Sequence, residues 1–252
     1  MGLSINLNAD IGEGMGADEA LLELVGAVSI ACGAHAGDPP TMRRLVALAA
    51  ARGVGIGAHP GFADREGFGR REIVMEPAAI EALVARQIED MRDVCAAAGA
   101  RLGHVKAHGA LYNMAARDGI ASEALCRAIC SIDPDLVVIA PADSAMERAA
   151  RGLGLAVARE AFPDRGYAAD GSLLPRGRAG AVIADPKVVA ARAVRMVREG
   201  TIECAAGAPV PIAAETHCIH GDRPDALAVA RAVRDGLEAA GIALGPLVGA
   251  RR

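Results

Sequence analysis

The sequence is poor in aromatic residues. Its 252 residues include no tryptophan, two tyrosines and three phenylalanines, although 52% of them are hydrophobic. This hydrophobic content excludes an intrinsically disordered chain, and a core of this size must be filled mainly by Ala, Val, Leu and Ile. No run approaches the ~18 consecutive apolar residues that a membrane-spanning helix requires, so we expect no membrane partner.

Charge excess and targeting signals are also absent. The formal net charge is −4, which offers no electrostatic footprint for nucleic acid or an anionic membrane. The N-terminal residues lack a basic segment followed by a hydrophobic stretch, so we expect no signal peptide. The six cysteines form no CxxC pair, and in a chain without a secretory signal we interpret them as reduced thiols. These features predict a cytoplasmic protein.

The usual local signatures of nucleotide and metal sites are missing as well. There is no GxxxxGK[ST] loop and no GxGxxG motif after a strand, so neither standard nucleotide-binding fingerprint is present. No HxH or HExxH spacing supports a metal site directly. Any cofactor site must therefore be assembled from residues far apart in the chain.

What the sequence does contain is a regular alternation of strand-like and helical segments. The expected strands are Leu3–Ala9, Ala27–Cys32, Val54–His59, Leu102–His108, Leu136–Ala140, Leu155–Glu160 and Val210–Thr216. The expected helices are Ala17–Val25, Pro39–Arg52, Pro77–Ala98, Ile120–Cys130, Ser144–Arg151, Pro186–Arg198 and Arg223–Ala240. Such alternation predicts parallel strands joined by right-handed crossovers.

Two architectures fit this alternation: a closed (β/α) barrel with seven or eight strands and an open doubly wound sheet. Polar residues follow nearly every expected strand, and a barrel gathers all of these strand ends around one mouth. An open sheet gathers only the ends near its switch point. We therefore favour an α/β fold of the barrel type. We see no linker or internal repeat and expect a single domain over residues 1–252.

The first and fourth expected strands each carry polar residues on one face. Asn6, Asn8 and Asp10 alternate with apolar residues, so they share a face that would line the barrel interior. Asp10 could instead merely cap the loop that follows. In the fourth strand Lys106 and His108 share parity, and a lysine that points into a barrel requires a charged partner or a substrate.

The full set of candidates consists of carboxylates, imidazoles and a lysine at the ends of the expected strands, a combination suited to general acid–base chemistry. They are Asp10, His35, His59, Lys106, His108, Glu160 and His220. Several other polar residues have structural interpretations: Asp38 and Asp222 as helix caps, and His104 as buried scaffold. His217 has the opposite strand parity to His220 and is a weaker candidate for the site. Small residues before His59, among them Gly57, suggest space in the barrel interior. Asp10 with His35 or His59 could alternatively hold a divalent metal.

Six segments in order resemble the motifs of one family, the LamB/YcsF proteins, whose members are called lactam-utilisation proteins or the A subunit of 5-oxoprolinase. The segments are NLNADIGEGMG, ACGAHAGDP, GIGAHPGFADREGFGRR, VKAHGALYN, EAFPDRGYAADGSLLPRGRAGAVI and CIHGD. They extend from Asn6 to Asp222. The resemblance implies a seven-stranded (β/α) barrel of the glycoside hydrolase and deacetylase type. It also implies ATP-dependent opening of 5-oxo-L-proline to L-glutamate together with two further subunits, B and C.

On this resemblance we expect a catalytic group and a substrate-binding group. The catalytic residues would be Asp10, His59, Lys106, His108 and His220. The substrate-binding residues would be Asn8, His35, Asn113, Glu160, Asp164, Arg165, Tyr167 and Asp222. ATP would carry Mg²⁺ as its counter-ion and would be handled largely with the partner subunits. Whether the protein itself binds a metal is left open.

The chain departs from the family pattern at a few positions without losing an ionisable group. Ala34 stands where an aromatic residue is usual, which would widen the pocket. Two alternative functions are retained. One is a stand-alone metal-dependent deacetylase or amidohydrolase, and the other is a non-catalytic subunit that binds a small molecule.

Overall fold

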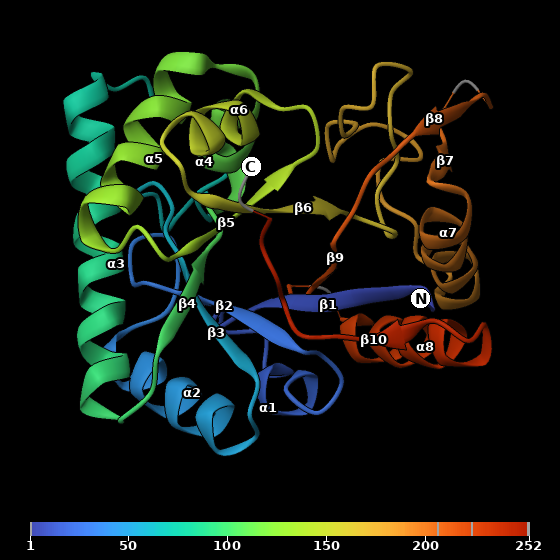
Figure 1. Ribbon diagram of the computed structural model, residues 1–252, viewed down its shortest axis with the longest axis horizontal. Coiled ribbons are helices and arrows are strands. Elements are labelled where there is room, and N and C mark those ends of the chain that lie inside the picture. Colours follow the sequence, from blue (N-terminus) through green and yellow to red (C-terminus); the bar gives the residue numbers. More distant parts are fainter. Residues whose placement is uncertain (1, 206, 223, 251–252) are drawn as a thin grey trace.

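Seven parallel strands form a closed barrel in the computed structural model, which describes residues 2–205, 207–222 and 224–250 (Figure 1). The strands, in their order around the barrel, are β1 (Ser4–Ile11), β2 (Ala27–Ala31), β3 (Gly55–His59), β4 (Leu102–Val105), β5 (Val137–Pro141), β6 (Ala156–Ala161) and β9 (Thr216–His220). Strand β9 pairs with both β6 and β1, and these two pairings close the sheet. The barrel prediction is confirmed, and the open doubly wound sheet is excluded.

Helices surround this barrel and cover its apolar outer face (Figure 1). They are α1 (Asp18–Leu21), α2 (Pro39–Ala51), α3 (Pro77–Ala97), α4 (Gly109–Arg117), α5 (Gly119–Ile132), α6 (Ala145–Gly152), α7 (Pro186–Glu199) and α8 (Ala226–Ala239). Helix α3 packs on α5, and α7 packs on α8. No helix within the described ranges is both long and apolar enough to cross a bilayer.

The alternation expected for the first strand is present. Ile5, Leu7 and Ala9 belong to the apolar core with exposed fractions of 3%, 1% and 0%. Asn8 points the other way and crosses the barrel interior, where its amide donates to Glu160 Oε1 at 2.9 Å. Asp38 caps α2 as expected, because its carboxylate accepts from the Thr41 amide at 2.8 Å.

The last barrel strand was placed too early in the sequence. We expected Val210–Thr216, but the barrel strand is β9 (Thr216–His220), and Val210 lies in a separate antiparallel hairpin of β7 (Thr201–Glu203) and β8 (Pro209–Pro211). Proline cannot donate a hydrogen bond to a central strand. The two prolines of β8 therefore fit an edge position better than the barrel wall.

Three expectations for helices also need correction. The first helix is limited to the four residues of α1, and α4 was not foreseen. Asp222 does not cap the last helix: α8 begins at Ala226, preceded by Asp225, and Asp222 instead forms an ion pair with Arg70. The expected helix start at Arg223 lies outside the described residues.

Candidate active site

Polar side chains from six strands converge at the carboxyl end of the barrel. The buried polar residues within the strands or just after them are Asn8, Asp10, His35, His59, Lys106, His108, Glu160 and His220. Two buried residues of the loops, Glu13 and Asp164, join them. Each is at most 9% exposed. Burial of so many polar groups is costly unless they are paired, so their mutual contacts determine what the site can do.

Lys106 occupies the centre of this group. Its Nζ lies 2.8 Å from Glu160 Oε1, 3.0 Å from the Asp10 carboxylate and 3.0 Å from Cys218 Sγ. The lysine is 2% exposed. The expectation that an inward lysine needs charged partners is thus met by two carboxylates, one from β1 and one from β6.

These charges determine the protonation states in the centre of the site. Burial alone would lower the pKa of Lys106, but Asp10 and Glu160 outweigh it and hold that pKa well above its ordinary value. Burial raises the pKa of Asp10, yet His59 and the Lys106 ammonium reverse the shift and leave the pKa below its ordinary value. Burial dominates for Glu160, whose pKa is raised. The two carboxylates that share Lys106 therefore differ in acidity.

Three histidines and one glutamate lie beside this ion-paired centre, nearer the mouth. The rings of His35 and His108 stack with centroids 3.7 Å apart, and His59 meets both of them edge-on. Glu13 Oε1 lies 3.2 Å from His108 Nδ1, 3.5 Å from His35 Nε2 and 3.7 Å from His59 Nε2. Burial lowers the pKa of His59 to about 3. His59 is therefore a neutral imidazole and can act as a base or as a ligand.

His220 forms a second polar pair on the opposite side of the mouth. Its Nδ1 lies 2.8 Å from Asp164 Oδ2, and its ring stacks on Phe162 at 5.4 Å. A carboxylate on one ring nitrogen fixes the orientation of the imidazole. His220 is therefore held in place, with Nε2 as the nitrogen that Asp164 does not engage.

Four of the predicted substrate-binding residues lie outside this convergence. Arg165 donates from Nε to Ala181 O and from Nη2 to Leu174 O, and the Tyr167 hydroxyl accepts from the Phe162 amide. These bonds stabilise the long loop after β6. Asn113 lies on the exposed face of α4. Asp222, paired with Arg70, sits at the rim. Direct contact of these four with a substrate stays a prediction.

The structure also places residues in the site that we did not predict. Glu13 joins the histidines, and the Tyr112 hydroxyl donates to Glu160 Oε2 at 3.0 Å. Glu13 was missed because it follows the strand in a glycine-rich turn, where Gly12 and Gly14 have positive φ and strand parity no longer applies. Its position in the quoted motif, three residues after Asp10, was the available signal.

The space expected above Gly57 is filled by protein. A Cβ at Gly57 would lie 2.1 Å from His104 Nε2, so the imidazole of His104 occupies the room that the glycine leaves. His104 Nε2 is 3.4 Å from Ser29 Oγ. Both residues are buried, which confirms the interpretation of His104 as scaffold at the deep end of the barrel.

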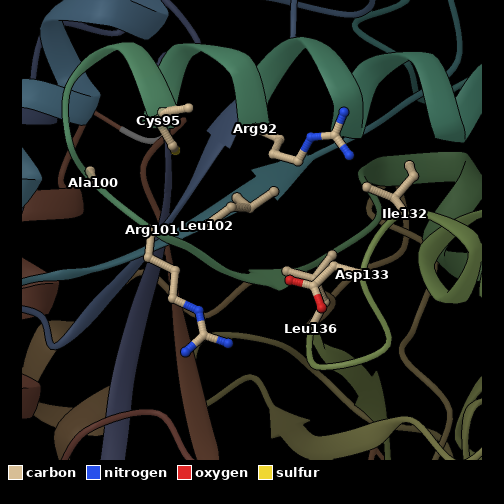
Figure 2. A pocket seen from close by; sticks show the side chains of 9 residues that line it. Arg92, Cys95, Ala100, Arg101, Leu102, Ile132, Asp133 and Leu136 are labelled. Carbon is tan, nitrogen blue, oxygen red and sulfur yellow. The ribbon is translucent and has the colours of Figure 1, made fainter.

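Two hollows in the surface differ in their relation to the mouth. The one in Figure 2 is lined by Arg101 and Leu102 at the start of β4 and by Asp133 and Leu136 just before β5. It therefore opens at the amino ends of the strands, away from the polar convergence. A larger hollow of about 500 Å³ lies beside the β2–α2 loop and is lined by Ala34 and by α3 residues such as Leu83 and Gln87. Whether Ala34 widens the substrate pocket stays a prediction.

The fold and the convergence define the class: a closed (β/α) barrel with buried carboxylates, imidazoles and a lysine at its mouth. Residues 5–252 match the LamB/YcsF family model, and the chain belongs to that family. It is 48% identical to the 5-oxoprolinase A subunit of Methylococcus capsulatus, over 99% of this chain and 98% of the relative.

Solved structures agree with this assignment. The lactam utilization protein from Thermus thermophilus superposes with a TM-score of 0.91 at 43% identity, covering 97% of this chain and 100% of that one. A family 4 carbohydrate esterase from Streptomyces lividans reaches a TM-score of 0.50 at 9% identity, covering 98% and 97%. The second likeness supports the deacetylase-type barrel alone.

Proposed function

We propose that this chain opens the ring of 5-oxo-L-proline to give L-glutamate, in a reaction driven by ATP, as the A subunit of a 5-oxoprolinase with subunits B and C. The names of the curated relatives support the reaction and the assembly. The observation that carries the proposal is the buried centre in which Lys106 lies between Asp10 and Glu160, next to neutral imidazole. This arrangement supplies a base, an acid and a fixed positive charge within one enclosed mouth.

The chemistry of a five-membered lactam requires such groups. Its amide is resonance-stabilised and its ring recloses readily, so phosphorylation of the carbonyl oxygen by ATP activates the carbon. Water then attacks that carbon and the ring nitrogen leaves as an amine, which gives γ-glutamyl phosphate. A second water hydrolyses this acyl phosphate to L-glutamate and inorganic phosphate. Asp10 or His59 would activate the water. His108 or His220 would protonate the leaving nitrogen.

Lys106 rather than Arg165 would balance negative charge that develops on the substrate. The Arg165 guanidinium already donates to two loop carbonyls, whereas the Lys106 ammonium lies among the reacting groups. The sequence has neither standard nucleotide fingerprint, so ATP with its Mg²⁺ would be bound largely by the partner subunits. This chain would then receive an activated ring.

The test is glutamate release from 5-oxoproline and ATP, measured with this chain alone and with subunits B and C. We expect release only in the mixture, and no turnover when Asp10→Asn replaces the wild-type chain. Asp185→Asn is the matched control, because Asp185 caps α7 on the exterior and asparagine caps as well as aspartate. Wild-type rates with Asp10→Asn would overturn the role of Asp10. ATP-independent release by the chain alone would instead indicate a self-sufficient amidohydrolase.

A further inference from the structure

Glu13, His35, His59 and His108 present four potential ligand atoms to one small volume. Each of these residues offers an atom within 4.8 Å of those of the other three. The separations from Glu13 Oε1 are 3.2, 3.5 and 3.7 Å, and His59 Nε2 lies 3.0 Å from His108 Nδ1. A tetrahedral ion with bonds of about 2.0–2.1 Å has ligand atoms roughly 3.3–3.4 Å apart. Four of the six separations are therefore close to the edges of a tetrahedral metal site, and the two from His35 to the other histidines are within 4.8 Å.

Two of the histidines, His59 and His108, each form a hydrogen bond to a backbone carbonyl through one ring nitrogen, and the unshared electron pair of the other nitrogen then points into this volume. His59 Nδ1 lies 2.8 Å from the carbonyl oxygen of Lys106, and His108 Nε2 lies 2.8 Å from that of Phe68. A carbonyl can only accept, so both of these nitrogens carry their hydrogens. In the neutral rings, His59 Nε2 and His108 Nδ1 then face each other at 3.0 Å as two acceptors. That contact is repulsive unless a cation lies between or beside them.

The surrounding charges favour a divalent cation over a single proton. Glu13 Oε1 is shielded from solvent and has no hydrogen bond of acceptable geometry to any described residue, and the same is true of both His35 ring nitrogens. Asp10 Oδ2 lies only 3.6 Å from His59 Nε2. The carboxylates of Glu13 and Asp10 thus face the imidazoles, and the Lys106 ammonium is engaged with Asp10 and Glu160 deeper in the barrel.

We propose that Glu13, His35, His59 and His108 form a binding site for one divalent transition metal ion of the zinc class. Imidazole nitrogen and carboxylate oxygen are ligands that zinc accepts. The carbonyls of Lys106 and Phe68 supply the outer hydrogen bonds that fix the tautomers of two of these rings. The parallel stack of His35 on His108 must open by a tilt of one ring, because in-plane electron pairs of parallel rings do not converge on one point.

His59 and His108 belong both to this site and to the proposed reaction, but metal binding is a property of the chain alone and is tested without the partner subunits. The untagged full chain is stripped with a chelator, and zinc binding is measured by titration calorimetry and by metal analysis after desalting. Cobalt(II), whose visible absorption is intense only in four-coordinate sites, reports the geometry. We expect one ion per chain and a four-coordinate cobalt spectrum.

Two ligand variants and a matched control decide the outcome. His59→Gln and Glu13→Gln should each weaken binding by more than the ~10–100-fold that loss of an outer hydrogen bond costs. His217→Gln is the control, since His217 is equally buried but lies on the outer face of β9, in register with Leu7. Circular dichroism verifies that each variant is folded.

Failure of the stripped wild-type chain to bind zinc or cobalt would overturn the site. Equal binding by wild type and both folded ligand variants would do the same, because the ion would then sit elsewhere. Loss of binding in His217→Gln comparable to that in His59→Gln would likewise count against these four ligands. Loss of glutamate release in the assembly, with zinc binding intact, would bear on the proposed reaction and leave the metal site standing.

Discussion

The two faces of strand β1 hold neighbouring residues in opposite surroundings. Leu7 is 1% exposed and packs in the apolar layer beneath the helices, whereas Asn8 is 0% exposed and bonds to Glu160 and Thr216 across the barrel interior. Burial does not distinguish the two positions, but their partners do. Apolar burial yields about 1.5–3 kcal/mol for a large side chain. Buried ion pairs give little net stability. We infer that the outer layer holds the barrel together and that the interior is kept polar for chemistry.

Strand β9 shows the same difference between its two faces, here with histidine on both. His217 faces outward in register with Leu7, and His220 faces the interior in register with Asp10. Neither ring nitrogen of His217 has a hydrogen-bond partner among the described residues, whereas His220 is held by Asp164. The same side chain is thus a packing element on one face and an imidazole oriented by a carboxylate on the other.

The largest difference between the polar interior and the apolar outer layer should appear when the positive charge of Lys106, at the centre of the interior, is removed. Lys106→Ala leaves Asp10 and Glu160 buried without their shared cation, so we expect a loss of about 3–5 kcal/mol in unfolding free energy together with loss of turnover. Urea unfolding measures the first effect and glutamate release the second.

Lys106→Met separates charge from volume at the same position. It keeps the length of the side chain but not the ammonium, so it should lose nearly as much stability as Lys106→Ala. A methionine variant as stable as wild type would mean that Lys106 acts by filling space. The interior would then contribute to stability much as the outer layer does.

The outer layer should respond in the opposite way to a comparable change. Leu7→Ala removes a fully buried side chain, and we expect a loss of ~3 kcal/mol, within the usual range of about 2–5 kcal/mol for this substitution. Turnover per folded molecule, measured in the complete assembly below the unfolding transition, should remain that of wild type. A fall in turnover while the chain is fully folded would show that the outer layer also shapes the mouth.

Strand periodicity determines how much of this difference between the two faces can be predicted from the sequence. Alternation predicted the inward face of β1 and the pairing of Lys106 with charged partners, because side chains on a strand alternate strictly. It failed where the strand pattern ends. Glu13 lies in a turn with left-handed glycines, and Tyr112 lies on the unforeseen helix α4. Their contacts with the site depend on loop paths that periodicity does not encode.

Contacts between segments far apart in the chain are the second feature that the sequence did not predict. The close approach of Glu13 to His108, 95 positions later in the chain, follows only from closure of the barrel. Arg165 shows the reverse case. The resemblance implied that it binds substrate, and in the structure its guanidinium donates to two carbonyls of the loop after β6, a role that residue type alone does not reveal. Residue type at a strand end therefore identified the mouth better than it identified roles within it.

The smallest effect concerns the outward histidine and pH. Burial lowers the pKa of His217 to about 3, compared with about 6.5 in an unfolded chain. Between these values the unfolded state binds the extra proton, so this stability is fully present above about pH 6.5 and is lost as the pH falls toward 3. The loss from pH 7 to pH 5 amounts to about 2 kcal/mol, at ~1.4 kcal/mol per pH unit. His217→Leu should remove it, so the urea-derived unfolding free energies at the two pH values should converge by that amount. An unchanged pH dependence would mean that His217 accepts a proton in the folded barrel, and the contrast with His220 would no longer rest on packing alone.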